Sequence, residues 1–295
     1  MSGVESLNRI ALGTVQFGLS YGVANQGGKV QADEAGRVLL AASEAGIDTL
    51  DTAIAYGDSE AVLGSLPLDG FQLISKLPDM PEHITDVDGW VTEQYRGSLE
   101  RLRVKRLRGL LLHRPQQLLG DKGQALYAAL LKLREQGGVE KIGISIYDPS
   151  ELEAFEGRMT FDMIQAPFNP VDKRLYDSGW LERLHGREVE IHVRSIFMQG
   201  LLLMDQQSRP AKFGRWNMIW DEWQHWLEQT RQTPVEACLR FALSFPEIAR
   251  VVVGVDSEAH LRQISSVSQQ TCDNPPSSLA CKDIELLNPS LWSRL

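Results

Sequence analysis

Residues 48–60, Asp-Thr-Leu-Asp-Thr-Ala-Ile-Ala-Tyr-Gly-Asp-Ser-Glu, combine an apolar strand pattern with a carboxylate, Asp51, and a phenol, Tyr56. Side chains alternate between the two faces of a strand, so two residues five positions apart would lie on opposite faces of a continuous strand. We therefore expect the chain to turn between Ala55 and Gly57. Such a turn would form the mouth of a barrel strand, where the catalytic groups of α/β barrels gather.

Two later apolar segments end in polar residues in a similar way. Residues 71–77 finish with Lys76, and residues 107–113 finish with His113, which Arg114 follows. The carboxyl ends of parallel strands meet at one rim, and we expect four side chains to share that rim: Asp51, Tyr56, Lys76 and His113. Each of them alone has a structural interpretation, such as a solvated lysine or a buried histidine. The four together favour a catalytic cluster.

Eight apolar, β-branched segments alternate with helical patterns, which is typical of a parallel sheet. The expected strands are 10–17, 48–55, 71–77, 107–113, 140–146, 162–167, 189–196 and 250–255. The expected helices are 31–46, 92–102, 124–136, 149–155, 175–184, 234–245 and 257–266. No pair of Gly-x-Gly-x-x-Gly halves is present, which favours a closed barrel over a doubly wound sheet. The sequence therefore predicts an α/β protein, a single (β/α)8 TIM barrel.

Composition narrows the function classes. The chain has 295 residues, 43% of them hydrophobic, and no Pro/Gly/Ser-rich linker divides it, so we expect one domain over residues 1–295. The net charge of −9 without any Lys/Arg-rich run argues against nucleic-acid and membrane-surface partners. Three scattered cysteines predict neither a disulfide framework nor a metal site. The sequence shows no signal-peptide pattern and no run of 18 apolar residues, which predicts a cytoplasmic protein.

The chain resembles the aldo-keto reductase family over nearly its whole length. The resemblance runs from Ile10-Ala-Leu-Gly-Thr through Thr233-Pro-Val-Glu-Ala to Val253-Gly-Val-Asp-Ser-Glu, and it includes the four rim residues. It implies an NAD(P)H-dependent reduction of a small-molecule aldehyde or ketone, without a metal. Members of the family often have a hairpin before the first strand. Only about nine residues precede it here, so we expect the bottom of the barrel to be closed differently or left bare.

The resemblance also implies a role for each of the four residues. Tyr56 would donate a proton to the developing alkoxide, since hydride transfer to a carbonyl needs a positioned acid. A phenol has a reference pKa near 10, and Lys76 would lower it by favouring the anion. Asp51 would hold the ammonium of Lys76, and His113 would orient the carbonyl oxygen.

The resemblance places the nicotinamide among the ends of several strands. Gly13, Thr14 and Val15 match the turn against the nicotinamide ribose, where a glycine lets the backbone approach closely. Ser145 and Gln165 match positions around the carboxamide, and Asp51 is a further candidate cofactor contact. Ile146 stands where an asparagine usually follows the serine, so we expect one carboxamide contact to be missing.

The seventh expected strand departs from the family pattern. It continues as Arg194-Ser195-Ile196-Phe197-Met198-Gln199-Gly200, and four of these residues are candidate cofactor contacts: Arg194, Ser195, Phe197 and Gly200. Arg194 replaces the aromatic residue expected to stack on the nicotinamide, and a planar guanidinium can stack too. Its charge could instead meet an anionic substrate or the cofactor pyrophosphate, or it could pair with a barrel carboxylate.

Val253-Gly-Val-Asp-Ser resembles the loop and helix terminus that hold the adenosine phosphate, where backbone N–H groups and the helix dipole favour an anion. The candidate contacts are Gly254, Asp256, Ser257 and Arg262. The loop itself has no cation, so we expect only a weak preference for NADP(H) over NAD(H).

The candidate substrate contacts are Phe17, Tyr56, His113, Arg114 and Trp216. Trp216 begins a series with Trp220, Trp223 and Trp226, whose spacing is typical of a packed helical face. The resemblance also implies that the tail, residues 271–295, borders the substrate pocket. The pattern leaves the choice between a monomer and a homo-oligomer open.

Three other functions stay open at this point. One is a redox-neutral reaction at a sugar carbon, in which the nicotinamide is recycled. Another is a regulatory module that binds the cofactor without turnover; the replacements Arg194 and Ile146 favour it slightly, and the four rim residues count against it. The third is a barrel that serves only as an oligomer scaffold.

Overall fold

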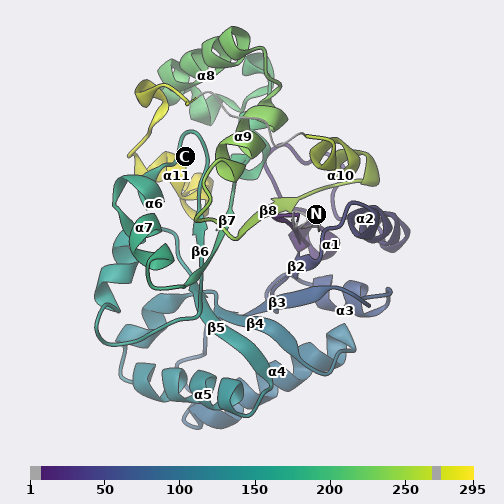
Figure 1. Ribbon diagram of the computed structural model, residues 1–295, viewed down its shortest axis with the longest axis vertical. Coiled ribbons are helices and arrows are strands. Elements are labelled where there is room, and N and C mark those ends of the chain that lie inside the picture. The colour runs from purple at the N-terminus through teal and green to yellow at the C-terminus, as the bar shows by residue number, and fades with distance from the viewer. Residues whose placement is uncertain (1–7, 268–273) are drawn as a thin grey trace, which may run out of the picture.

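The computed structural model describes residues 8–267 and 274–295. Eight parallel strands close into a barrel in the order of the sequence (Figure 1), which confirms the predicted fold. The strands are β1 (Ile10–Gly13), β2 (Thr49–Asp51), β3 (Gln72–Leu77), β4 (Leu107–Leu112), β5 (Val139–Ser145), β6 (Met163–Pro167), β7 (Glu190–Arg194) and β8 (Arg250–Gly254). Each lies within or next to its predicted segment. The predicted strand 10–17 is shorter than expected because the chain turns at Thr14 into a helix.

Helices connect the strands on the outside of the barrel. They are α1 (Val15–Gly18), α2 (Ala32–Glu44), α3 (Ser59–Gly64), α4 (Val87–Leu102), α5 (Gly123–Glu135), α6 (Arg174–Asp177), α7 (Trp180–His185), α8 (Asn217–Thr230), α9 (Pro234–Leu243), α10 (Glu258–Ser265) and α11 (Ile284–Leu287). The short 3-10 helices that matter below are η2 (Pro149–Ala154), η5 (Ala211–Trp216) and η7 (Pro289–Arg294). The sequence pattern therefore located most of the connecting helices.

Local side-chain chemistry sets several helix boundaries. Helix α4 begins at Val87, before the predicted start at residue 92, because Asp86 accepts a hydrogen bond from the Gly89 N–H (2.9 Å). The predicted helix 175–184 is divided into α6 and α7, since Gly179 takes a left-handed conformation with φ of 75°. The segment 149–155 is the 3-10 helix η2.

The interior of the barrel carries one small apolar layer below a polar rim. Ile74, Leu111 and Met163 form this layer, separate from the main core between strands and helices. Side chains two residues apart on a strand share a face, so Lys76 and Gln165 lie on the same inner face as Ile74 and Met163, one step nearer the carboxyl ends. The apolar layer thus separates the polar rim from the lower end of the barrel.

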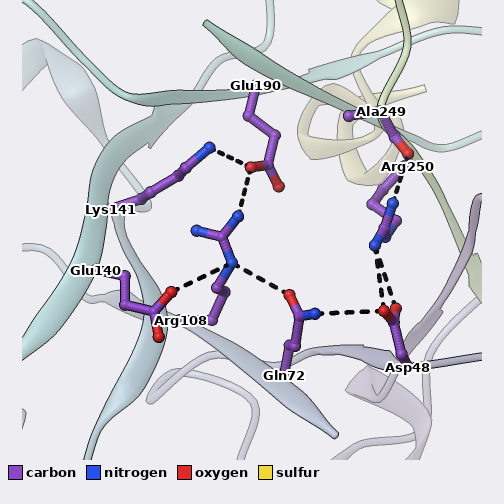
Figure 2. A pocket seen from close by; sticks show the side chains of 8 residues that line it. All are labelled: Asp48, Gln72, Arg108, Glu140, Lys141, Glu190, Ala249 and Arg250. Carbon is purple, nitrogen blue, oxygen red and sulfur yellow. Dashed lines mark hydrogen bonds and ion pairs between the residues drawn. The ribbon is translucent and has the colours of Figure 1, made fainter.

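The lower end of the barrel is closed by a ring of paired polar side chains around a cavity of about 590 Å³ (Figure 2). Arg108 donates to Gln72 (3.1 Å) and Glu190 (2.8 Å), and Lys141 also pairs with Glu190. Arg250 pairs with Asp48 (3.3 Å). These residues lie at the amino ends of their strands, so the ring stabilises the end opposite the predicted catalytic rim. The expectation that this end is closed differently or left bare stays a prediction, because residues 1–7 lie outside the described residues.

Helix α8 lies at one end of the molecule with the C-terminal segment beside it (Figure 1). Trp220, Trp223 and Trp226 are buried, and the indole N–H groups of Trp220 and Trp223 donate to the carbonyls of Phe213 (2.9 Å) and Leu202 (3.1 Å). The packing interpretation of this series is confirmed. In the described part of the chain, no helix is long and apolar enough to cross a membrane.

Candidate active site

Lys76 is the centre of the polar rim. Its side chain is completely buried, and its ammonium donates to Asp51 Oδ1 (2.7 Å), Asp51 Oδ2 (2.8 Å) and the Thr52 carbonyl (3.0 Å). Gln165 donates a further hydrogen bond to Asp51 across the barrel (2.8 Å). A buried charge is costly unless it is paired and hydrogen-bonded, and both charges of this pair meet that requirement. The structure therefore brings Asp51 and Lys76 together as the sequence predicted.

Tyr56 reaches the same point from a turn after β2. The Tyr56 N–H donates to the Ala53 carbonyl (3.0 Å), and Gly57 has φ of 54°, so the chain turns where the sequence predicted. The hydroxyl of Tyr56 lies 3.5 Å from Lys76 Nζ. The ring of His113 packs edge-on against the Tyr56 ring, with centroids 5.6 Å apart. All four predicted catalytic side chains thus form one cluster at the carboxyl ends of β2, β3 and β4.

Burial determines the protonation states of this cluster. Burial, followed by the charge of Asp51, raises the pKa of Tyr56, although Arg194 opposes the shift. This direction is opposite to the one expected from Lys76 alone, because burial, the largest cause, and the charge of Asp51 both favour the neutral phenol. Burial also lowers the pKa of Lys76, and burial with the Lys76 and Arg194 charges lowers the pKa of His113 to about 3. At neutral pH the phenol is protonated and the imidazole is neutral.

The residues predicted for the nicotinamide end line the same rim. Ser145 donates to Gln165 Oε1 (3.3 Å), which ties both predicted carboxamide contacts to Asp51. Thr14 donates to the Asp51 carbonyl (3.1 Å) and fixes the end of β1 against β2. Gly13 pairs with Gly254 in the register of β1 and β8. The predicted residues at this end are thus assembled beside the catalytic cluster, and Val15 follows them at the start of α1.

Arg194 points into the mouth without a carboxylate partner. Its guanidinium donates to Ser145 Oγ (3.4 Å), Ser195 Oγ (3.1 Å) and the Ile146 carbonyl (3.0 Å). Among residues 8–267 and 274–295, no carboxylate oxygen lies within ion-pair distance of it. The structure therefore removes the alternative that Arg194 pairs with a barrel carboxylate. Its Cζ lies 4.7 Å from the centroid of the Tyr147 ring.

The segment after β7 is held in an unusual backbone conformation. Ser195, Met198 and Gln199 are non-glycine residues with positive φ, and such strained positions cluster at functional sites. A Cβ on Gly200 would lie 2.6 Å from the Ala24 side chain, so this glycine allows two loops to approach each other. Phe197 is buried in the core. Gly200 and Phe197 hence shape the loop, and their predicted contact with the cofactor stays a prediction.

The N-terminus of α10 already holds a carboxylate. Glu34 of α2 accepts a hydrogen bond from the Glu258 N–H (2.6 Å), and Ser257 caps the helix by accepting from His260 N (3.3 Å). Asp256 accepts from the Asn25 side chain (3.0 Å). Ser257 and Asp256, two of the predicted contacts for the adenosine phosphate, therefore make hydrogen bonds within the protein.

Arg262, the cation predicted to meet this phosphate, is engaged elsewhere. It pairs with Glu258 (2.7 Å) and Glu44 (2.9 Å) on the exposed surface of α10 and α2. The structure thus shows no unpaired lysine or arginine at this end of the predicted cofactor site among the described residues.

Two predicted substrate contacts lie in packed positions. Phe17 is completely buried in the main core, so it presents no surface to a substrate. The indole N–H of Trp216 donates to Asp283 (3.0 Å) of the C-terminal segment, and the side chain is almost fully buried. Both contacts indicate a packing role. Arg114, in contrast, is exposed at the mouth, with its Cζ 5.5 Å from the Tyr147 ring centroid.

The C-terminal segment packs over the loops after β6 and β7. The Cys281 N–H donates to the Val171 carbonyl (2.9 Å), and Lys212 of η5 donates to the Trp292 carbonyl (2.7 Å). Residues 271–273 of the predicted tail lie outside the described residues. In the part of the chain that the structure describes, no group of three or more His, Cys, Asp or Glu side chains could hold a metal ion.

A family model, the "Aldo/keto reductase family", matches residues 9–274. The chain belongs to the aldo-keto reductase family. The "D-threo-aldose 1-dehydrogenase" of a Pseudomonas species is 30% identical over 290 residues, which cover 83% of this chain and 87% of that protein. An "Aldo-keto reductase" of Mycolicibacterium smegmatis is 32% identical over 135 residues, 43% of this chain and 44% of that protein.

Solved structures of aldo-keto reductases share the fold. The holo form of an aldo-keto reductase from Bacillus halodurans superposes with a TM-score of 0.71 at 19% identity, covering 90% of this chain and 88% of that one. A glycerol dehydrogenase from Gluconobacter oxydans gives 0.68 at 22% identity, covering 92% and 90%. At these identities the likeness extends to the barrel fold alone.

The sequence interpretation of this aldo-keto reductase missed two residues. Tyr147 contacts both arginines of the mouth, and its place just after Ser145 and Ile146, at the carboxyl end of β5, could have indicated it. Glu34 lies in the first turn of α2, next to Asp33, where acidic residues are ordinary. No sequence signal could have placed its carboxylate at α10.

Proposed function

We propose that this protein reduces an aldehyde or ketone to an alcohol with a nicotinamide cofactor, with Tyr56 as the general acid. The observation that carries the proposal is the buried cluster at the mouth, in which Tyr56 Oη lies 3.5 Å from the ammonium of Lys76. Asp51 holds that ammonium with both carboxylate oxygens (2.7 and 2.8 Å). Membership of the aldo-keto reductase family supports carbonyl and alcohol chemistry at this site.

The protonation states favour the reductive direction. A proton donor must carry its proton at the working pH, and the raised pKa of Tyr56 keeps the phenol protonated throughout the neutral range. The neutral imidazole of His113 can donate or accept one hydrogen bond beside the phenol and orient the carbonyl oxygen. The positive charge of Lys76 lies where it can stabilise the phenolate that forms as the proton leaves.

Membership of the family supports a nicotinamide, which when bound at the rim would supply the hydride. Ser145 and Gln165 offer a hydroxyl and an amide side by side at the rim. The adenosine end supports only weak selection of a 2′-phosphate, because Glu34 and Asp256 are acidic and Arg262 is paired. We propose that NADP(H) and NAD(H) both bind, with a small preference for NADP(H).

One relative supports a sugar-derived carbonyl as the substrate, since its name describes an aldose, which is a polyhydroxylated compound. We also propose that residues 1–295 act as one domain in the cytoplasm.

The proposal is tested by following the absorbance of NADPH and of NADH with a panel of aldehydes and ketones that includes neutral sugars, sugar acids and sugar phosphates. We expect oxidation of the cofactor that depends on the carbonyl compound and yields the alcohol. Cofactor binding without carbonyl-dependent oxidation anywhere in the panel would contradict the proposal and would favour a regulatory module.

A further inference from the structure

Arg194 presents unused hydrogen-bond donors to the mouth. A guanidinium has five N–H donors, and Arg194 uses three of them, one on each nitrogen, with the neutral acceptors Ser145, Ser195 and Ile146. One N–H therefore remains on each terminal nitrogen, which is the arrangement that binds a carboxylate or phosphate through two bonds. Among the described residues no acidic side chain pairs with the half-buried Arg194, so its free donors leave room for an anion.

A second guanidinium lies close by. The Cζ atoms of Arg194 and Arg114 are 4.7 Å and 5.5 Å from the centroid of the same ring, that of Tyr147. The one ion pair of Arg114 in the described chain is with Asp79, at 3.9 Å between two largely exposed side chains, which is a weak interaction. Both arginines lower the pKa of His113, so both lie near the catalytic cluster.

Arg194 is left without an acidic partner by its neighbours. Asp51 neutralises Lys76 and therefore does not compensate Arg194. Arg174 is paired with Asp148 and Asp172, and Arg114 lies 3.9 Å from Asp79. Of these three arginines, Arg194 alone has no acidic partner among the described residues, so a ligand with a negative charge would complete its surroundings.

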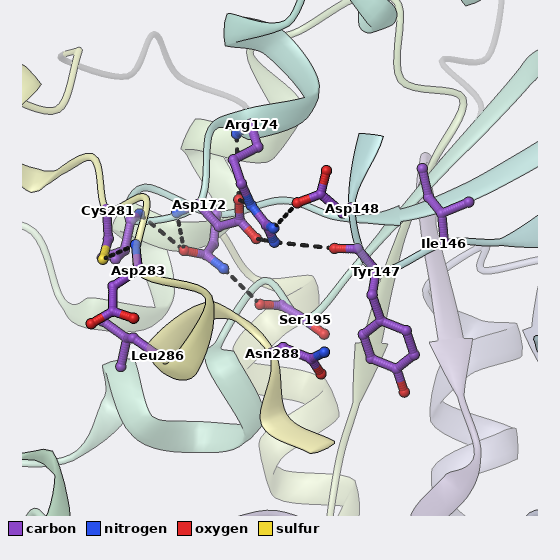
Figure 3. Close-up of polar contacts among 12 residues, drawn as sticks. Ile146, Tyr147, Asp148, Asp172, Arg174, Ser195, Cys281, Asp283, Leu286 and Asn288 are labelled. Atoms are coloured by element: carbon purple, nitrogen blue, oxygen red, sulfur yellow. Dashed lines mark hydrogen bonds and ion pairs between the residues drawn. The ribbon is translucent and has the colours of Figure 1, made fainter. Parts of the chain in front are cut away.

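The scaffold holds this arrangement in advance. Arg174 donates to the Tyr147 carbonyl (3.1 Å) and pairs with Asp148 (2.5 Å) and Asp172 (2.8 Å). Figure 3 shows this network, with the ring of Tyr147 directed away from Arg174. Glu151 accepts from the backbone N–H of Tyr147 (2.7 Å). The loop that carries Tyr147 is thus fixed on both sides, which reduces the ordering cost of binding.

We propose that Arg194 and Arg114, which both lie against the ring of Tyr147 as a positioning residue, form an anion subsite for the substrate. The substrate is then a carbonyl compound that carries a carboxylate or a phosphate, such as a sugar acid or a sugar phosphate. This inference rests on the proposed reductase function, because it assigns the substrate class of the same site.

The test compares carbonyl compounds that differ in charge and little else. One pair is 4-carboxybenzaldehyde and 4-carbamoylbenzaldehyde, and another is D-glyceraldehyde 3-phosphate and D-glyceraldehyde. The variants are Arg194→Gln, Arg114→Gln and Arg194→Lys. The matched control is Arg106→Gln, an exposed arginine just before β4 at the opposite end of the barrel, which pairs only at 3.4 Å with Glu140.

The measured quantity is the ratio of kcat/KM for the charged compound to kcat/KM for its neutral counterpart. We expect Arg194→Gln to lower this ratio by about 10- to 100-fold, the usual range for a hydrogen bond to a charged group. Arg114→Gln should lower it less, since this side chain is more exposed, and Arg194→Lys should retain part of it. The control should leave the ratio unchanged. In the wild type, a larger ratio for the benzaldehyde pair identifies a carboxylate as the preferred anion, and a larger ratio for the glyceraldehyde pair identifies a phosphate.

Equal losses on charged and neutral compounds would overturn the inference. The inference would also be overturned if a change in the affinity of Arg194→Gln for NADPH and NADH accounted for the whole loss of kcat/KM, because Arg194 would then bind the cofactor. A failure of the proposed function is separable from these results. If no carbonyl compound is reduced, titration calorimetry of wild-type protein and Arg194→Gln with terephthalate and with inorganic phosphate still measures the subsite, and equal binding by the two proteins would refute it.

Discussion

Replacing Lys76 by methionine removes a buried ammonium while keeping most of the side-chain volume. The change deletes three hydrogen bonds and leaves the carboxylate of Asp51, which is 4% exposed, with the Gln165 amide as its remaining donor. Removing one partner of a buried ion pair costs about 3–5 kcal/mol, because the other charge stays buried without compensation. That is a large part of the roughly 5–15 kcal/mol by which proteins are stable.

Equilibrium unfolding in urea, followed by circular dichroism, measures this cost. With an m-value of about 3 kcal/mol/M, the midpoint should fall by roughly 1 to 1.7 M. The matched control is Lys29→Met, which removes an exposed lysine that is 3.0 Å from Asp58. Exposed pairs contribute about 1 kcal/mol or less, so this variant should unfold near the wild-type midpoint.

The double variant Asp51→Asn, Lys76→Met distinguishes the loss of the ion-pair attraction from the cost of leaving the Asp51 carboxylate buried and unpaired. It should be more stable than Lys76→Met alone, because a neutral amide replaces the unpaired carboxylate. A loss for Lys76→Met as small as that for Lys29→Met would refute the reasoning. It would mean that Asp51 and Lys76 do not form a desolvated pair in the folded protein.

Two further predictions concern protonation and the cofactor. The pKa of His113 is lowered to about 3, and that of Tyr56 is raised above its usual value. At constant ionic strength, kcat/KM for reduction should therefore be level between about pH 5 and pH 9 and should fall only as the pH rises past the ordinary phenol range. An inflection near pH 6.5 that disappears in His113→Asn would contradict the assignment of a neutral imidazole to His113. The dissociation constants of NADPH and NADH should differ by less than about 30-fold, roughly 2 kcal/mol. The variant Glu34→Gln should increase the affinity for NADPH relative to that for NADH by about fivefold, because it removes one negative charge near the 2′-phosphate in a solvated site. A difference above about 10³-fold in favour of NADPH in fluorescence titrations would show that a cation reaches the 2′-phosphate.

The sequence predicted those features that depend on strand order and strand ends. Asp51 ends β2, Lys76 is the last but one residue of β3, and His113 directly follows β4. The carboxyl ends of parallel strands meet at one rim, so the meeting of these residues could be predicted without coordinates. The turn that brings Tyr56 to them could also be predicted, because side-chain alternation requires one.

Features that depend on burial and on long-range contacts could not be predicted. The direction of the Tyr56 pKa shift depends on how deeply the phenol is buried and on how close the charge of Asp51 lies to it, neither of which is visible in the sequence. Phe17 and Trp216 are aromatic residues near strand and helix ends, yet their side chains turn into the core and toward Asp283. Glu34 reaches α10 across 224 residues of sequence.

Tyr56→Phe provides the most direct test of the central claim, that Tyr56 is the acid which protonates the reduced carbonyl. Single-turnover oxidation of bound NADPH by a carbonyl compound would be measured in the wild type and in the variant, together with the dissociation constant of NADPH. We predict that the dissociation constant changes little and that the rate falls by about 10²-fold or more, the usual cost of losing a general acid. An unchanged rate in Tyr56→Phe would contradict the account, because the proton would then reach the alkoxide from another group.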